Sequence, residues 1–188
     1  MDIVQNGWAG MSEIPIYENY GTYKPKMPAS KIVRRLLDTM PPEYLRGLGS
    51  IVVSSQTALS RRERRKKSWS RGKKIPREHI LGYYGPAWQG QPAFIELYVD
   101  RICLRLPRPL TWVGLVRDMV VGRVLFHEIG HHLHFTSRPE FREREDVADK
   151  WERELLRTAI LKRHRYARSL RPLFRFLGFL HKKYGRKA

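Results

Sequence analysis

A strongly apolar helical pattern from residue 111 to residue 134 constrains the fold of this chain more than any other feature. Its sequence, TWVGLVRDMVVGRVLFHEIGHHLH, has a helical pattern and is apolar around most of its surface. A helix of this kind has to be buried, so we expect the remaining elements to pack around it. With 188 residues, of which 41% are hydrophobic, the chain is long enough for one domain with a core.

Two histidines lie one helical turn apart near the end of this stretch. The segment His127-Glu128-Ile129-Gly130-His131 has the HExxH pattern. At 3.6 residues per turn, His127 and His131 leave the same face of a helix, so both imidazoles can bind one zinc ion. Glu128 lies about 100° around the helix from His127, away from the metal but close to a water molecule on it. The pattern predicts a zinc-activated water with Glu128 as general base.

A catalytic zinc site also needs a third protein ligand and one open position. In metzincins a glycine and then a third histidine follow the motif at fixed spacing, but here those positions hold His134 and Ser137. The next segment, EDVAD, instead places Glu145 and Asp149 four residues apart, so that one can bind the metal and the other can orient a histidine ligand. The single cysteine, Cys103, excludes a thiolate-rich site.

The segments HEIGHH and EDVADKWERELL together resemble the core of the ImmA/IrrE family, small bacterial and phage-related metallopeptidases of the gluzincin type. The resemblance covers roughly residues 115 to 156. It implies that His127, His131 and Glu145 bind Zn²⁺ and that Glu128 is the general base. It further implies hydrolysis of peptide bonds in an intracellular protein, because family members act on such proteins, some of them DNA-binding regulators.

The same resemblance implies an α+β fold of the minimal zincin type. A small mixed or antiparallel β-sheet would pack on the HExxH helix and on a following glutamate helix. The basic helical tail that we expect at the C-terminus is a departure from the family. Asp149 is the expected partner of His127, by analogy with the gluzincins. Gly130 and Ala148 are small where the two helices would cross, which lets Glu145 approach the metal.

Neighbouring residues compete for several of these roles. His132 and His134 are expected to orient other groups, to cap the helix or to be exposed, rather than to bind metal. Glu145 is preferred because it alone has an aspartate four residues later and an alanine at the helix contact; its competitors are Glu143, Glu152 and Glu154. No oxyanion-stabilising residue is assigned, and aromatic packing is the expected role of the candidates Tyr83, Tyr84 and Tyr98.

The rest of the chain predicts one earlier helix and three strands. The helix spans residues 30–40 and stops before a Pro-Pro pair, and the strands span residues 50–54, 79–84 and 93–100. A Gly/Pro-rich turn suits a hairpin between the last two strands. Residues 93–100 alternate in polarity, and we favour a structural strand at the centre or the edge of the sheet over an edge strand on which substrate adds.

These elements suggest one domain with attachments. We expect an irregular N-terminal arm at residues 1–28, a metallopeptidase domain at 29–160 with a basic insert at 60–75, and a basic helical tail at 161–188. A capping box at residues 137–140 would start the glutamate helix, which could run to about residue 169. The chain has no apolar run that could span a membrane and no signal peptide, so a cytoplasmic location is expected.

The net charge of +19 comes from two segments. Residues 61–74 hold nine Lys/Arg and one acid, and residues 155–188 hold eleven Lys/Arg and no acid. Nucleic acid is a candidate partner for residues 61–74 and 157–187, although the first segment equally fits a solvated loop. For the tail, we expect first that its apolar face packs on the domain, second that its Lys and Arg contact nucleic acid, and third that it forms a helix on a membrane surface.

Two other function classes remain open at this stage. The first is a nucleic-acid-binding or toxin-like module in which the zinc has only a structural role. The second is a protease of DNA–protein crosslinks similar to SprT-like proteins, which use a third histidine after the motif. Here the later histidines are His164 and His181, both in the basic C-terminal part of the chain.

Overall fold

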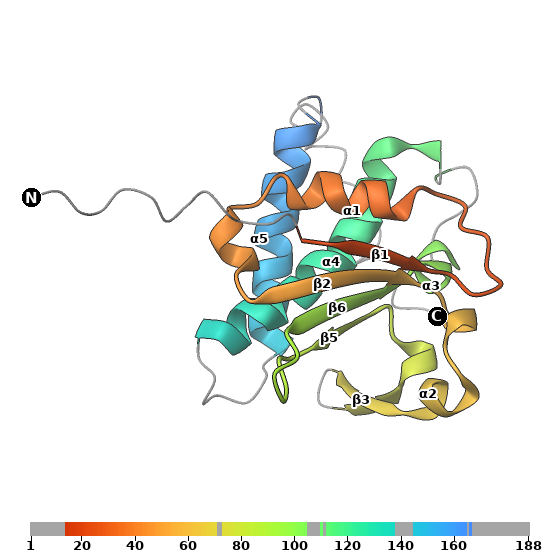
Figure 1. Cartoon of the computed structure of the whole chain (residues 1–188). Helices are drawn as coiled ribbons and strands as arrows, with labels where there is room; N and C mark the ends of the chain where they lie inside the picture. The colour runs from red at the N-terminus through yellow and green to blue at the C-terminus, as the bar shows by residue number, and fades with distance from the viewer. Residues whose placement is uncertain are drawn as a thin grey trace, which may run out of the picture.

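A four-stranded mixed β-sheet lies beside the two longest helices (Figure 1). The computed structural model describes residues 14–70, 73–104, 110, 112–137, 145–164 and 166, except for the side chains of residues 68–70, 73, 74 and 137. The strands follow the order β1-β2-β6-β5 across the sheet, and their bounds are Ile16–Asn19 for β1, Leu48–Ser54 for β2, Ala93–Tyr98 for β6 and Gly82–Gly85 for β5. Strand β2 is parallel to both β1 and β6, whereas β5 is antiparallel to β6. The predicted α+β class and the small mixed sheet are confirmed.

The alternating strand β6 separates two apolar layers. Its residues Ala93, Ile95 and Leu97 are buried in the main core, while Tyr98 is buried in a smaller cluster with Leu59 and Ile80. Strand β6 lies between β2 and β5, so the interpretation of residues 93–100 as an edge strand is wrong. The strand also ends earlier than predicted, because the chain turns into the short helix α3 (Val99–Leu104).

Besides α3, which contributes Val99 and Ile102, three longer helices cover the main core. Helix α1 (Ala29–Leu37) buries one apolar face, as its sequence predicts. Helix α4 (Gly114–Ser137) contains the HExxH segment, and helix α5 (Glu145–Arg163) contains EDVAD. Helix α5 ends before residue 169. The proposed capping box lies largely outside the described residues, and Ser137 is the last residue of α4 rather than a cap of α5.

Helices α4 and α5 approach closely where Gly130 meets Ala148. A Cβ atom added to Gly130 would lie 2.8 Å from both the Cα and the carbonyl oxygen of Ala148, so the neighbouring backbone leaves no room for a side chain. Ala148 is completely buried. The sequence prediction of a close contact between two small residues at this crossing is confirmed.

Replacing Gly130 with alanine should therefore separate the two helices. We expect Gly130→Ala to lower the free energy of unfolding by about 1–3 kcal/mol, because its methyl group overlaps backbone atoms that cannot rotate away. Gly114→Ala is the matched control, since its Cβ would meet only the flexible end of Arg117, at 3.9 Å. Chemical denaturation of both variants measures the difference, and equal stabilities would contradict the close contact.

Two segments predicted to be irregular contain regular structure. Within the predicted arm, β1 pairs with β2 along its whole length; its four residues give too short a pattern to be recognised in the sequence. The predicted basic loop forms helix α2 (Arg61–Arg65) and an antiparallel hairpin of β3 (Lys67–Ser70) and β4 (Lys73–Pro76). Short 3₁₀ helices complete the described elements: η1 (Pro42–Leu45), η2 (Gln56–Ala58) and η3 (Arg77–His79).

The predicted strand at residues 79–84 is shifted along the chain, because His79 belongs to η3 and β5 begins at Gly82. The antiparallel hairpin of β5 and β6 agrees with the prediction. Among the described residues, no helix combines the length and the apolar character needed to cross a membrane.

Candidate metal centre

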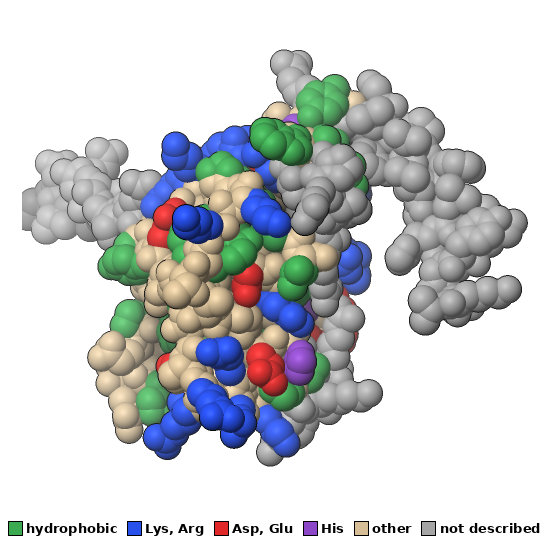
Figure 2. Space-filling view, turned by 90° about the vertical axis from the view of Figure 1, so that its right-hand side faces the viewer, with side chains coloured by type: hydrophobic (Ala, Val, Ile, Leu, Met, Phe, Trp, Pro, Cys, Tyr) green, Lys and Arg blue, Asp and Glu red, His purple; other side chains and the backbone are tan. Residues whose placement is uncertain are grey.

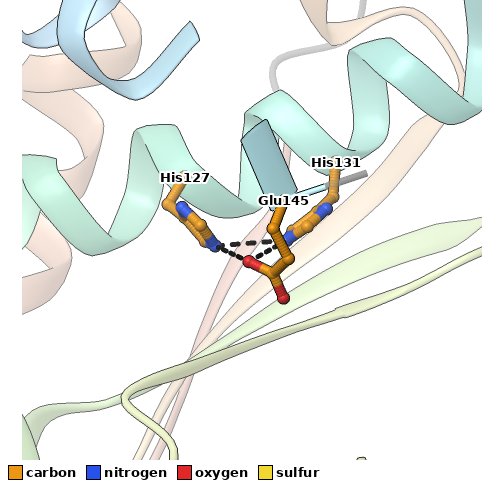
Figure 3. Close-up of side chains that lie close together, drawn as sticks. All are labelled: His127, His131 and Glu145. Atoms are coloured by element: carbon orange, nitrogen blue, oxygen red, sulfur yellow. Dashed lines mark hydrogen bonds and ion pairs between the residues drawn. The ribbon is translucent and has the colours of Figure 1, made fainter. Parts of the chain in front are cut away.

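Helix α4 directs two imidazoles toward the start of helix α5 (Figure 3). The Nε2 atoms of His127 and His131 lie 3.2 Å apart. Glu145, the first residue of α5, places its Oε2 atom 3.3 Å from Nε2 of His127 and 3.9 Å from Nε2 of His131. The structure thus brings together the three residues that the sequence predicts as ligands.

The spacing of these three atoms suits a zinc ion. Ligands that bind zinc tetrahedrally at 2.0–2.1 Å lie about 3.3 Å from one another. Two of the three distances match this value closely, and the third, between Glu145 and His131, is longer at 3.9 Å. The two nitrogens and one oxygen also form a donor set that zinc accepts in catalytic sites. The residues therefore fit the ion that the motif implies.

The opposite ring nitrogen of His127 faces two carboxylates. Oδ1 of Asp149 lies 3.1 Å from Nδ1 of His127, and Oε2 of Glu152 lies 3.5 Å from it. Glu152 is buried, and its other oxygen accepts a hydrogen bond from Nε of Arg123 at 3.1 Å. A proton on Nδ1, hydrogen-bonded to Glu152 and facing the charge of Asp149, leaves the lone pair of Nε2 directed toward Glu145 and His131.

A second group of possible metal donors consists of His127, Asp149 and Glu152. It shares the Nδ1 atom just described and offers one imidazole instead of two. Because this nitrogen can donate one hydrogen bond, we interpret the two carboxylates as partners that orient His127 rather than as a separate metal site. Asp149 thus lies beside the histidine for which the sequence analysis proposed it.

The electrostatic surroundings of His127 favour positive charge. Burial alone would lower the pKa of this imidazole, but the hydrogen bond with Glu152 and the charges of Glu128, Glu145 and Asp149 outweigh that effect and raise it. The same carboxylates would attract a divalent cation. The centre is therefore acidic in a chain whose net charge is strongly positive.

Glu128 is buried beneath the edge strand of the sheet. A Cβ atom added to Gly82 of β5 would lie 2.6 Å from Oε1 of Glu128 and 2.8 Å from Cγ1 of Val124. Glycine at this position thus allows β5 to pass directly over the Glu128 carboxylate. The side chain of Glu128, the predicted general base, therefore lies between helix α4 and the edge strand β5.

The histidine after the motif has a structural role. His132 is almost completely buried; its Nδ1 lies 3.2 Å from the Tyr84 hydroxyl and its Nε2 lies 3.1 Å from the carbonyl oxygen of Arg46. Burial lowers the pKa of His132, although the Arg46 carbonyl opposes the shift. A neutral ring therefore donates to Arg46 and accepts from Tyr84. His134 is also buried and belongs to neither group of possible metal donors among the described residues.

The other candidate metal ligands do not belong to this centre among the described residues. Nε2 of His164 lies 2.9 Å from Oδ2 of the buried Asp118, which also accepts from Arg163 at 2.9 Å. His164 is thus engaged with helix α4 well before the HExxH segment. Glu154 is exposed, and Glu143 and His181 lie outside the described residues.

The tyrosines considered for oxyanion stabilisation have other contacts. Tyr84 meets His132, Tyr98 donates to Glu96 at 3.0 Å, and the ring of Tyr83 lies 4.2 Å from the Arg77 guanidinium carbon. Aromatic and polar packing thus accounts for the three side chains.

Sequence reasoning missed two features of the centre. Glu152 was considered only as a competitor of Glu145, although its position seven residues later places it two turns further along the same helix face. That spacing was the available signal for a second carboxylate beside His127. Gly82 gave no signal, because its closeness to Glu128 depends on how the sheet packs on α4.

Comparisons of the chain with protein-family models, with curated proteins and with solved structures give no significant match.

Proposed function

We propose that this chain is a zinc-dependent endopeptidase of the gluzincin type, with a minimal zincin-like fold and a kinship to the ImmA/IrrE family. Its substrate would be an intracellular protein. The observation that supports this most strongly is the triangle of His127, His131 and Glu145 donor atoms, with edges of 3.2, 3.3 and 3.9 Å. A buried glutamate next to one of these histidines in the sequence completes the set needed for peptide hydrolysis.

Each residue has a separate task in this reaction. Bound zinc would act as a Lewis acid that lowers the pKa of water and polarises the scissile carbonyl. Glu128 accepts the proton of the attacking water and can deliver it to the leaving amine. The carboxylates of Asp149 and Glu152 face Nδ1 of His127 and thereby orient its ring.

Substrate binding would use strand β5. This strand ends the sheet order, so the backbone groups on its outer edge have no partner strand within the described sheet. An extended peptide can add to such an edge through main-chain hydrogen bonds. Because Gly82 of β5 lies against Glu128, a peptide on this edge would pass close to the base.

The crosslink-protease alternative is less well supported. It requires a third histidine at the metal, whereas Nε2 of His164 lies 2.9 Å from Asp118 and Glu145 lies beside both motif histidines. No observation in the described residues favours a purely structural zinc over a catalytic one.

Zinc content and substrate turnover test the proposal together. The purified chain should contain about one zinc per molecule, since three donor atoms converge on one point. Quantitative proteomics in the native cell, comparing the wild-type chain with Glu128→Gln, should show proteins that are cleaved only in the presence of the wild type. A chain without zinc would contradict the metal centre, and zinc without any cleaved protein would favour the structural alternative.

A further inference from the structure

Six of the seven residues from Arg61 to Lys67 are cationic, and all six are exposed. They lie on helix α2, at its C-cap and at the first residue of β3, and we call them the α2 surface: Arg61, Arg62, Arg64, Arg65, Lys66 and Lys67. Figure 2 shows Lys and Arg side chains gathered at the lower end of one face, where Figure 1 places α2. Exposed cations are common on protein surfaces. These six indicate a binding surface only if the backbone holds them in place and nearby carboxylates do not neutralise them.

The α2 surface is fixed to the domain. The backbone carbonyl of Lys66 accepts a hydrogen bond from the backbone N–H of Arg77 at 2.9 Å, and Gln56 donates its side-chain N–H to the Arg77 carbonyl at 2.9 Å. The backbone N–H of Gln56 in turn donates to the Asp100 carboxylate at 3.1 Å. These contacts connect α2 to η2, η3 and α3. The cations are therefore presented at defined positions, which a solvated loop would not provide.

The charge of the α2 surface is only partly offset within the described residues. The one acid between its members, Glu63, accepts from both the backbone N–H and the hydroxyl of Ser60, at 2.9 and 2.6 Å, and thereby caps the helix. The nearby Arg77 already pairs with Glu96 at 3.4 Å. None of the six cations forms an ion pair with a described carboxylate. Ordering so many like charges in one short helix costs free energy through their repulsion.

We propose that the α2 surface binds the phosphate backbone of nucleic acid. Duplex DNA carries about one negative charge per 1.7 Å of its axis, a density that matches closely spaced cations. Arginine also offers paired N–H groups that suit phosphate oxygens. A lipid surface is disfavoured because α2 contains no apolar side chain that could enter the acyl region. The proposal stands independently of peptidase activity.

The test measures binding of the full chain to a short fluorescent DNA duplex at several salt concentrations. Arg61→Gln/Arg62→Gln/Arg65→Gln removes three exposed charges and leaves Arg64, whose Nε donates to the Leu59 carbonyl. We expect affinity to fall about tenfold or more, and the slope of log K against log salt to become shallower by about 2–3, since each phosphate contact contributes about 0.9.

The matched control removes three exposed charges elsewhere, through Lys31→Gln/Lys150→Gln/Arg157→Gln. This variant should bind like the wild type, and both triple variants should keep the wild-type melting temperature. Equal weakening in the two variants would reduce the effect to net charge and overturn the proposal. It would also be overturned by a wild-type chain that does not bind the duplex, or that binds a polyglutamate peptide of the same charge equally well, which would indicate an acidic protein partner.

Discussion

Glu128→Gln should abolish peptide hydrolysis while the chain keeps its zinc. The substitution preserves the shape of a side chain that is buried beneath Gly82, so we expect the packing of β5 on α4 to be unchanged. The amide cannot accept the proton of the attacking water, and loss of a general base typically slows such reactions by about 10²–10⁴-fold. The rate should be measured on a substrate found by comparing wild-type and variant cells.

Glu154→Gln is the control for this prediction, because Glu154 is exposed on α5. It should leave both zinc content and rate at the wild-type level. Cleavage by Glu128→Gln at the wild-type rate would remove Glu128 from the mechanism. Loss of zinc from Glu128→Gln would instead indicate that the Glu128 carboxylate is needed for metal binding.

The core of the candidate site could be predicted because it depends on local geometry. His127 and His131 are four residues apart on one helix, so helical periodicity alone directs both rings to one side. To predict Glu145 as a ligand, the sequence also had to indicate a second helix that packs closely against the first. The small residues Gly130 and Ala148 gave that signal, and the structure agrees with it, because a Cβ atom added to Gly130 would lie only 2.8 Å from the Cα atom of Ala148.

The features that could not be predicted depend on contacts between distant segments. Strand β1 has four residues, and its parallel pairing with β2 crosses more than thirty positions of sequence. The basic segment gave no apolar period, because α2 is held by a capping box and by bonds to Arg77 rather than by a buried face. The position of Gly82 over Glu128 depends on how β5 packs on α4.

Glu145→Ala should release zinc from the centre. The substitution removes the only carboxylate oxygen among the three converging donor atoms and leaves two imidazoles to hold a divalent cation. Loss of an outer partner of a ligand typically costs about 10–100-fold in metal affinity, and loss of a ligand should cost more. Zinc content after dialysis against a weak chelator measures the effect.

Two further variants separate the gluzincin centre from the alternative with a third histidine. Glu154→Ala should keep its zinc, because this carboxylate is exposed on the same helix. His164→Gln should also keep zinc, because the ring that it replaces is bonded to Asp118, and the amide can still donate to that carboxylate. If His164→Gln lost the metal while Glu145→Ala retained it, the third ligand would be a histidine. The metal centre would then not be formed by Glu145 of α5 beside the two histidines of α4.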